Sequence, residues 1–303
     1  MKIALIGGSS FICQNLISYI QHNKSLSKNL SFIIFDEIKK KSLYKIVPYL
    51  YPGSKLDYGL LFESDVIINF TAMGLNGVDS KNKNLLYEIN LYEPIRMANA
   101  LEKNKYKGKI ISFGSSHEIG KTMSNEKFNE EQILNSTYKC LNDYGVSKRL
   151  LTKFISNSTN LDWTHLILPN IYGINFEPEH RIIPYLLKCI NTNISPIIKN
   201  INNNRQFLNV LDLCDLLTKI ILSNTSFSGI YNVAPDESLT IKELILIIER
   251  VYNKKFTRRN ELLKNEDNGD SLLLNNKKLI KTASWKPKKL INDYIIMNKK
   301  LRF

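Results

Sequence analysis

The sequence predicts an α/β protein in which a doubly wound parallel sheet is followed by a smaller carboxy-terminal lobe. Short apolar runs alternate with helical patterns along the first 170 residues, as in chains that build a parallel sheet. Residues 65–70 (DVIINF) are apolar almost throughout, which is typical of strands buried on both faces. After about Gly173 the pattern loosens into shorter elements. We therefore predict a first domain over residues 1–170, with 205–225 returning to it, and a lobe over 171–303.

The first element is a strand from Lys2 to Ile6, followed by a turn that begins with Gly7 and a helix that begins near Phe11 and Ile12. In a dinucleotide site, such glycines let the backbone approach a pyrophosphate at the positive end of the helix. A full fingerprint would repeat glycine at positions 10 and 13, where this chain has the small residues Ser10 and Cys13. The turn thus indicates a degraded dinucleotide site, with an ordinary strand-to-helix turn as the alternative.

The second predicted strand runs from Ser31 to Phe35 and ends at Asp36, where a nucleotide site keeps the carboxylate that accepts from ribose hydroxyls. A carboxylate there repels a 2′-phosphate, so Asp36 favours NAD over NADP. Lys39 to Lys41 follow closely and could offset that repulsion, which leaves NADP possible. Asp57 closes the next short segment, and a turn of small residues that includes Ala72 follows the strand at 65–70.

A long helical pattern over residues 85–103 contains Asn90, and a strand over residues 109–113 follows it. That strand leads into Ser115, Ser116 and His117. Because ligands bind doubly wound sheets beyond the carboxyl ends of the strands, Ser115 is a candidate site residue. A serine that only caps the turn is the alternative.

The next helix begins at residues 142–151 (NDYGVSKRLL) and carries Tyr144 and Lys148 four residues apart. This spacing places both side chains on one helix face, with about 5 to 6 Å between their Cβ atoms. A nearby cation favours the phenolate and is expected to lower the pKa of Tyr144. Taken alone, the pair also fits an aromatic core residue beside a solvated lysine.

The remaining elements are shorter. We predict strands at 162–168, 205–210 and 230–233 and helices at 182–190, 212–222 and 241–251. Asn170 follows the first of these strands, and Arg205 begins the second.

The 303 residues include 42 Lys plus Arg against 28 Asp plus Glu, a net charge of +14 that favours anionic partners. The basic residues are spread along the chain, so we expect a solvated basic face and no nucleic-acid site. The four cysteines are far apart and predict neither a disulfide framework nor a metal site. The chain shows no signal peptide and no apolar run of transmembrane length, so we expect a cytoplasmic protein without a membrane partner.

Together these motifs resemble the extended short-chain dehydrogenase/reductases, Rossmann-like enzymes that include nucleotide-sugar epimerases, dehydratases and 4-ketoreductases. The resemblance extends over nearly all of the chain. It rests on the segments GGSSFIC, DVIINFTA, YEINLYEP, GSSHEIG, DYGVSKRLL, LPNIYG, RQFLNVLDLCDLL, GIYNVA and WKP.

The resemblance implies an NAD-dependent enzyme, with NADP possible, that acts on a nucleotide-diphosphate sugar. Ser115, Tyr144 and Lys148 would be the catalytic triad, in which Tyr144 exchanges a proton with the sugar oxygen. The implied cofactor-binding residues are Gly7, Ser10, Phe11, Ile12, Asp36, Asp57, Ala72 and Lys148. The implied substrate-binding residues are Asn90, His117, Asn170 and Arg205, with the last two on the pyrophosphate. Relatives commonly pair through helices that include the Tyr144 helix, so a homodimer is expected.

Departures from the family pattern narrow the reaction. The 4,6-dehydratases carry an Asp-Glu pair directly after the catalytic serine or threonine, where this chain has Ser116 and His117. Glu118 lies one position too late to replace that pair, and His117 either lines the pocket or contacts substrate. These departures argue against a dehydratase. The GSSHEIG form, the NLYEPIRMANAL helix and the compact length resemble the 4-ketoreductases for 6-deoxy or dideoxy sugars of surface polysaccharides, which we favour, with an NAD-dependent 4-epimerase, favoured by Asp36, as the alternative. A non-catalytic protein that binds nucleotides or RNA is a remote third reading.

Overall fold

The structure is a computed structural model that describes residues 1–37, 44–49, 55–74, 82–158, 160–173, 175–262 and 269–300. Lys39 to Lys41, which bear on the choice between NAD and NADP, lie outside these residues.

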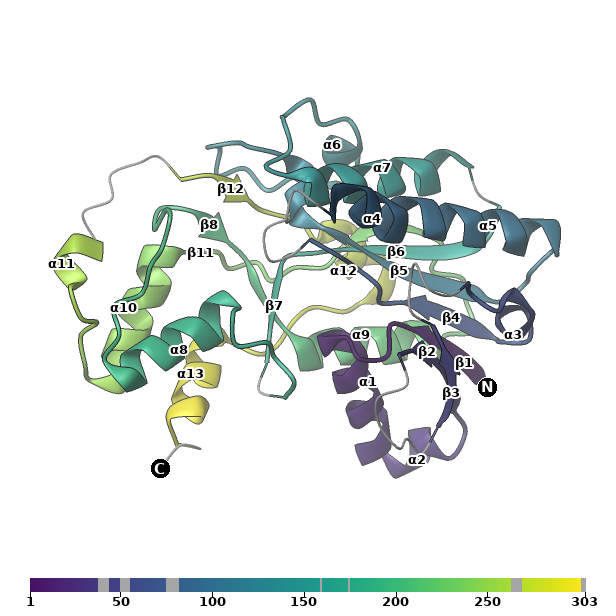
Figure 1. Cartoon of the computed structure of the whole chain (residues 1–303), viewed down its shortest axis with the longest axis horizontal. Coiled ribbons are helices and arrows are strands. Elements are labelled where there is room, and N and C mark those ends of the chain that lie inside the picture. The colour runs from purple at the N-terminus through teal and green to yellow at the C-terminus, as the bar shows by residue number, and fades with distance from the viewer. Residues whose placement is uncertain are drawn as a thin grey trace.

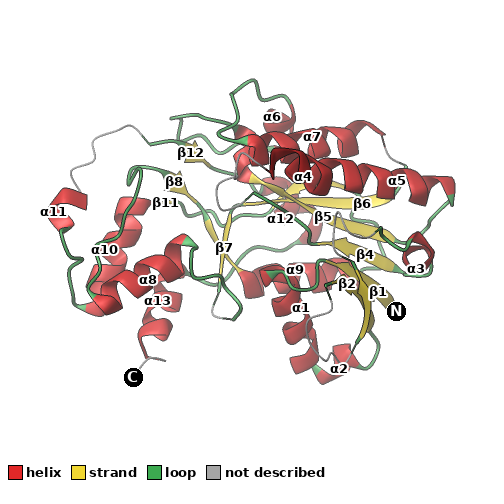
Figure 2. Cartoon of the chain, in the orientation of Figure 1, coloured by secondary structure: helices red, strands yellow, loops and turns green. Residues whose placement is uncertain are grey.

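A seven-stranded parallel sheet forms the centre of the molecule (Figures 1 and 2). Its strands stand in the order β10-β6-β5-β4-β1-β2-β3. Their bounds are β1 Lys2–Ile6, β2 Ser31–Asp36, β3 Lys45–Pro48, β4 Val66–Asn69, β5 Lys109–Ser115, β6 Asp162–Leu168 and β10 Gly229–Asn232. The strand order reverses between β1 and β4, and such switch points are where doubly wound sheets bind ligands. The predicted α/β, Rossmann-like class is confirmed.

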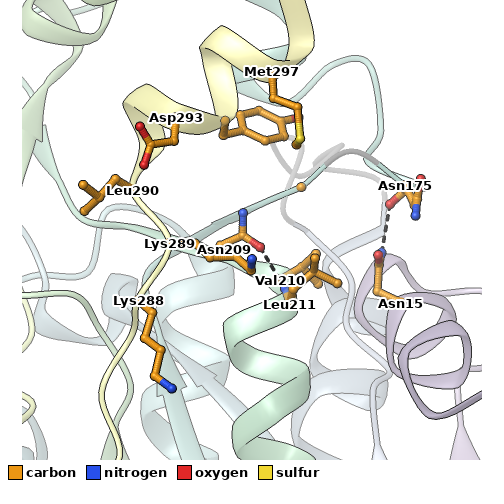
Figure 3. A pocket seen from close by; sticks show the side chains of 12 residues that line it. Asn15, Asn175, Asn209, Val210, Leu211, Lys288, Lys289, Leu290, Asp293 and Met297 are labelled. Atoms are coloured by element: carbon orange, nitrogen blue, oxygen red, sulfur yellow. Dashed lines mark hydrogen bonds between the residues drawn. The ribbon is translucent and has the colours of Figure 1, made fainter. Parts of the chain in front are cut away.

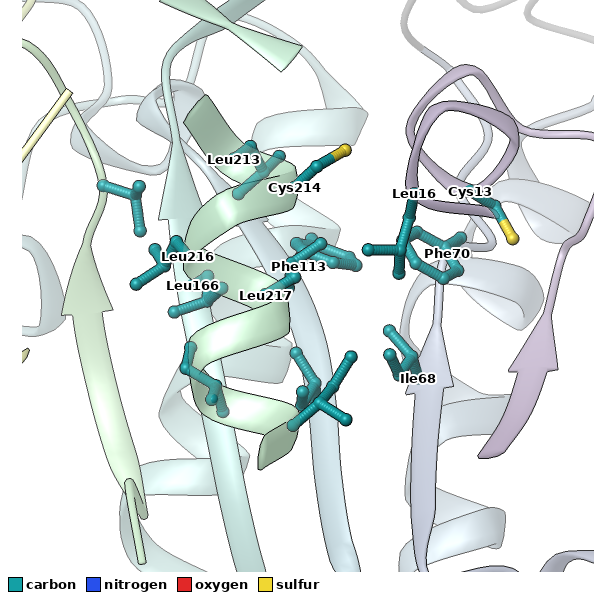
Figure 4. Packing of buried hydrophobic residues seen from close by; sticks show 14 of the residues in the cluster. Cys13, Leu16, Ile68, Phe70, Phe113, Leu166, Leu213, Cys214, Leu216 and Leu217 are labelled. Atoms are coloured by element: carbon teal, nitrogen blue, oxygen red, sulfur yellow. The ribbon is translucent and has the colours of Figure 1, made fainter. Parts of the chain in front are cut away.

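Helices cover both faces of this sheet (Figure 1). One face is covered by α1 (Phe11–His22), α9 (Val210–Leu222) and α12 (Lys277–Ala283), and the other by α3 (Tyr58–Phe62), α5 (Glu93–Lys103) and α7 (Asp143–Ser158). Along β4, Val66 and Ile68 contribute to the first core while Ile67 contributes to the second. Figure 4 shows part of the first core, where α9 and α1 contribute Leu217 and Leu16. Burial on both faces explains why these strands are apolar throughout.

The helical pattern over residues 85–103 corresponds to three consecutive elements. These are α4 (Lys83–Tyr87), the π-helical turn η2 (Glu88–Tyr92) and α5. Pro94 lies in the first turn of α5 and has no amide proton to donate to the carbonyl of Asn90 four residues earlier. A local widening of the helix at this place is therefore expected, and π turns often occur near functional sites.

The carboxy-terminal lobe has its own core, formed by α8 (Ile182–Thr192), α10 (Ile241–Tyr252) and α13 (Ile291–Lys300). Two small sheets connect it to the large domain: β7 (Asn170–Tyr172) with β9 (Phe207–Asn209), and β11 (Leu239–Thr240) with β8 (Asn204–Arg205) and β12 (Ser271–Leu272). The remaining short helices are α2 (Lys24–Ser27), η3 (Ser116–Ile119), α6 (Glu130–Leu134) and α11 (Arg259–Leu262).

One part of the predicted domain division is wrong. Strand β10, which the sequence analysis places in the lobe, pairs with β6 and extends the large sheet. Helix α12 also packs on the large domain, through Leu279 and Ala283. The chain therefore returns to the first domain over a longer stretch than 205–225, because the β6 edge must be paired and covered. In the described residues, no helix has the length and apolar character needed to span a bilayer.

Candidate active site

The structure brings Ser115, Tyr144 and Lys148 together at the carboxyl end of β5. Ser115 is the last residue of that strand, and the other two lie in the first turns of α7. All three are buried, with 7%, 5% and 4% of their surface exposed. The Ser115 side chain interacts with the Tyr144 phenol and lowers its pKa. The Lys148 Nζ lies 5.9 Å from the centre of the Tyr144 ring and donates to the carbonyl oxygen of Phe113 at 2.9 Å.

Local sequence explains how Ser115 and α7 meet. Ser115 is the N-cap of η3, where its hydroxyl accepts the His117 N–H at 3.3 Å and the Glu118 side chain accepts the Ser115 N–H at 2.7 Å. This reciprocal capping box fixes the backbone on which the Ser115 hydroxyl stands. Gly145 lets α7 approach η3 closely, because a Cβ there would lie 2.8 Å from the carbonyl oxygen of His117.

The expectation that Lys148 lowers the pKa of Tyr144 is wrong for the protein groups. Burial raises the pKa of Tyr144 to about 12, and Ser115 and Arg181 only partly oppose that effect. Burial also lowers the pKa of Lys148 to about 8, while Glu118 acts in the opposite direction. Desolvation disfavours the charged form of both groups and is the largest cause of each shift. The site thus holds the protonated phenol of Tyr144 beside the ammonium group of Lys148, which loses its proton more easily than an exposed lysine does.

Arg181 is a site residue that the sequence analysis missed. It precedes α8, and its guanidinium lies 5.0 Å from the centre of the Phe11 ring. It also donates to the carbonyl oxygen of Ile171 at 2.9 Å and interacts electrostatically with Tyr144. Arg181 therefore places a cation between the turn after β1 and the Tyr144 phenol. It stands alone in a loosely patterned segment, so no spacing signal could have found it.

His117 and Arg205 form the other side of the site. The Arg205 guanidinium is paired with Asp270 at 2.9 Å, with only 11% and 9% of the two side chains exposed. Burial and the charge of Arg205 lower the pKa of His117 to about 4, so the imidazole is neutral at pH 7. Its ring lies edge-on to Tyr144 at 5.8 Å, and its Nδ1 has no hydrogen-bond partner among the described residues. Asp270, which holds Arg205, is a second residue that the sequence analysis missed.

The turn after β1 has the shape of a phosphate cradle. Gly7 adopts a φ of +84°, which favours glycine, and a Cβ at Gly8 would overlap the Ile34 side chain. The Asp36 carboxylate accepts the Ser9 N–H, which places it against the turn. Ser10 caps α1, and its hydroxyl accepts the Cys13 N–H at 3.3 Å. The close approach and the start of a 12-residue helix fit a dinucleotide pyrophosphate.

The other predicted residues are less central. Phe11 and Ile12 begin α1, Asp57 caps α3 by accepting the Leu60 N–H at 3.2 Å, and Ala72 follows β4. Asn170 begins β7, and its N–H donates to the carbonyl oxygen of Gln206 at 3.2 Å.

Asn90 does not face the site: it is 0% exposed, and its amide group is hydrogen-bonded to the Met73 N–H, the Met73 carbonyl oxygen and the Ser147 hydroxyl. The Asn90 side chain joins the loop after β4 to α7, and a substrate contact at this residue stays a prediction.

A cavity of about 460 Å³ lies elsewhere, among α1, α9 and α13 (Figure 3). Its wall includes Asn15, Leu211, Lys289 and Met297 and none of the predicted site residues. It is thus separate from the chemistry described above.

The fold, the glycine turn and the buried Ser115, Tyr144 and Lys148 define the class of short-chain dehydrogenase/reductases, which use a nicotinamide cofactor. Within this class, residues 3–234 match the model of the NAD dependent epimerase/dehydratase family, and the chain belongs to that family of NAD-dependent enzymes. Its members act on nucleotide sugars.

The chain is similar to a dTDP-4-dehydro-6-deoxyglucose reductase of Escherichia coli, with 27% identity over 225 residues. That match covers 70% of this chain and 63% of the reductase, so it extends over less than two thirds of the relative. The fold is also similar to that of UDP-glucuronic acid 4-epimerase from Bacillus cereus, with a TM-score of 0.81, 16% identity and 100% of both chains covered. The dTDP-glucose 4,6-dehydratase from Bacillus anthracis gives a TM-score of 0.76, 17% identity and coverage of 100% and 96%.

Proposed function

We propose that the chain reduces the 4-keto group of a nucleotide-activated 6-deoxy or dideoxy hexose, in the synthesis of surface-polysaccharide sugars. The observation that carries this proposal is the pairing of a protonated Tyr144 with a neutral His117. Burial raises the pKa of Tyr144 to about 12, and a phenol is the form that can protonate a ketone oxygen. The neutral His117 stands where a dehydratase needs a carboxyl group. The similarity to a 4-keto-sugar reductase is in line with this chemistry.

The residues of the first domain suit NAD. Gly7, Ser10, Phe11 and Ile12 would hold its pyrophosphate, and Asp36 would accept from the adenosine ribose. Asp57, Ala72 and Lys148 would complete the site. When bound, NADH supplies the hydride for the sugar carbon.

The protein side chains would then act on the substrate oxygen. Tyr144 donates its phenolic proton to the developing alkoxide, and the neighbouring Ser115 donates its hydroxyl proton to the same oxygen. Such proton transfer contributes about 10²- to 10⁴-fold in rate. Arg205, oriented by Asp270, and Asn170 would bind the nucleotide-sugar pyrophosphate, with His117 beside the sugar.

The test is incubation of the purified protein with NADH or NADPH and dTDP-4-dehydro-6-deoxyglucose, followed by absorbance at 340 nm. Net cofactor oxidation with formation of a 4-hydroxy sugar is expected. An unchanged absorbance with every 4-keto-6-deoxy nucleotide sugar tried would reject the reductase.

The second candidate is an NAD-dependent 4-epimerase, and Asp36 favours it. Its carboxylate lies against the Ser9 amide, where it would repel the 2′-phosphate of NADP. Epimerases retain NAD, whereas many reductases prefer NADPH. Isomerisation of UDP-glucose or UDP-glucuronic acid without net cofactor turnover would select this reading.

We also infer that two cytoplasmic copies pair through α5 and α7. These neighbouring helices and the adjoining η2 leave Tyr92 and Leu150 49% and 42% exposed. Leu150→Glu should convert a dimer to a monomer in light scattering, while Ile197→Glu, at an 87% exposed position in the lobe, should not. A wild-type protein that is monomeric at micromolar concentration would contradict the pairing.

A further inference from the structure

Glu118 is a buried carboxyl group directly behind Ser115, and the proposed chemistry leaves it without a role. Its surface is 0% exposed. Its Oε1 accepts the Ser115 N–H at 2.7 Å, while its Oε2 has no hydrogen-bond partner in the described part of the chain. A carboxylate buried with one oxygen unpartnered is costly unless a cation compensates it. The surroundings of Glu118 therefore decide its charge.

A chain of buried polar side chains runs beside Glu118. It links Trp163 Nε1 to Ser112 Oγ (2.7 Å), Ser112 Oγ to His165 Nδ1 (2.7 Å), and His165 Nε2 to Thr152 Oγ1 (2.9 Å). Thr152 gives its hydroxyl proton to a carbonyl oxygen, so in the neutral imidazole Nδ1 of His165 accepts from Ser112, whose oxygen also accepts from the indole. That leaves the His165 proton on Nε2, which donates to Thr152. Thr152 in turn gives its single proton to the carbonyl oxygen of Lys148 at 3.0 Å.

Thr152 favours the ionised form of Glu118, but its hydroxyl proton is the one donated to the carbonyl oxygen of Lys148. When Glu118 is ionised, its hydrogen bond comes from the Ser115 amide, and its charge must be balanced by cations. The ionisable groups that interact with it or lie beside it are Lys148, Arg149 and Tyr144 on α7, Cys140 before that helix, and His165 on β6. His165 is neutral, because burial lowers its pKa to about 3. Arg149 is already committed to the carbonyl oxygens of Glu118 and Ile119. Lys148 is thus the cation that links Glu118 to the catalytic set.

We propose that Glu118 is a positioning residue of the active site, which fixes the Ser115 backbone by hydrogen bonding and supplies the buried negative charge that keeps Lys148 protonated. The proposal rests on the proposed function, in which a protonated Lys148 holds the cofactor ribose beside Tyr144. It assigns a task to Glu118 that the sequence analysis did not foresee.

Glu118→Gln separates the two tasks, because the amide oxygen can still accept the Ser115 N–H while the charge is gone. Glu118 raises the pKa of Lys148, so its removal should let Lys148 lose its proton at lower pH. The alkaline limb of kcat should move down by about one pH unit, which is about a tenfold loss of turnover above the limb. KM for the sugar should change little.

The matched control is Glu130→Gln, since Glu130 is also buried and accepts a backbone N–H, from Asn232 at 2.7 Å, away from the triad. Its pH profile should coincide with that of the wild type. A Glu118→Gln profile that coincides with both would overturn the proposal.

A second measurement needs neither turnover nor a folded position-118 variant. In protein labelled with ¹³C at the glutamate carboxyls, Glu118 and Glu177 should titrate near pH 7, because burial raises the pKa of each to about 7. Glu177→Gln assigns the pair by removing one signal. Lys148→Met should raise the midpoint of Glu118 and leave that of Glu177, whose cation is Arg181. An unmoved Glu118 midpoint would sink the proposal, whereas a wild type without turnover would reject only the proposed function.

Discussion

At the active site, burial shifts the acidity of Tyr144 and Lys148 in opposite directions. The phenol becomes harder to ionise, and the ammonium becomes easier to neutralise. The spacing of Tyr144 and Lys148 therefore does not set their pKa values alone. These values also depend on the surrounding residues Ser115, Arg181 and Glu118. The protonation states at this site therefore depend on the surrounding residues as much as on the predicted triad.

Tyr144→Phe should lower turnover by about 10²- to 10⁴-fold, because it removes the proton donor and leaves the ring in place. NAD affinity, measured by calorimetry, should stay within about twofold, since the phenol is not predicted to hold the cofactor. Tyr106→Phe is the control: its hydroxyl donates to Ser64 at 2.8 Å, away from the site, and its loss should leave turnover intact. Full activity in Tyr144→Phe would exclude the proposed proton donor.

Gly8→Ala should weaken NAD binding by about tenfold or more, because the new Cβ overlaps Ile34 and forces the turn outward. Ser9→Ala, at an exposed position in the same turn, should bind NAD as the wild type does. Calorimetric titration of both variants with NAD makes the comparison. Equal affinities would show that the turn after β1 does not hold the cofactor.

The sequence could predict the triad but not its environment. Ser115 follows an apolar strand, and Tyr144 and Lys148 share a helix face, but only the resemblance to the family joins the three into one predicted triad. Arg181, Asp270 and Glu118 come from segments without periodicity, and their partners are distant in sequence or hidden by burial. The pKa direction of Tyr144 was missed for the same reason, because desolvation depends on the whole fold.

At the level of elements, the π turn η2 joins the large sheet to α7 through Asn90. The amide of Asn90 bonds both backbone groups of Met73 and the Ser147 hydroxyl, at 2.9 to 3.1 Å. The sequence shows Asn90 and Pro94 but not the widened turn, and the substrate contact at Asn90 was expected from the resemblance to the family.

Asn90→Ala should lower the free energy of unfolding by about 2 to 4 kcal/mol, since it leaves buried polar groups of Met73 and Ser147 without partners. Asn104→Ala, at the exposed end of α5, removes one bond to a carbonyl and should cost less than about 1 kcal/mol. Urea denaturation measures both. A loss at Asn90 no greater than that at Asn104 would mean that the buried bonds contribute nothing.

Among the strands, apolar runs were predicted well, β3 was not predicted, and β10 was predicted as a strand but assigned to the lobe. β3 contains Lys45 and Pro48 and has partly exposed residues, so it lacks the pattern of a buried strand. β10 has only four residues, which do not reveal which sheet they join. Its place beside β6 is set by the uncovered edge of the large sheet, a property that no local window contains.

For the molecule as a whole, the Arg205 and Asp270 pair joins distant parts of the chain. Arg205 lies in β8 and Asp270 directly precedes β12, and both flank the substrate side of the site. Because both side chains are nearly buried, neither charge can be satisfied by water. The ion pair therefore links the packing of the lobe to the position of the predicted pyrophosphate ligand.

Asp270→Asn should destabilise the protein by about 3 kcal/mol, because Arg205 is left as an uncompensated buried charge. It should also raise KM for the nucleotide sugar, since the guanidinium is no longer oriented. Glu179→Gln removes an exposed pair with Lys188 and should cost less than about 1 kcal/mol. Chemical denaturation and steady-state kinetics give the two readouts. Similar losses in both variants would refute a special role for the buried pair.

The pairing of β10 with β6 has a consequence for synthesis on the ribosome. The strands at positions 162–168 and 229–232 are neighbours in space, but about a fifth of the polypeptide is translated between them. Until β10 emerges from the ribosome, the nascent chain exposes the unpaired apolar edge of β6, to which another molecule could bind. Chaperone capture of ribosome-bound chains should accordingly diminish once β10 has left the exit tunnel.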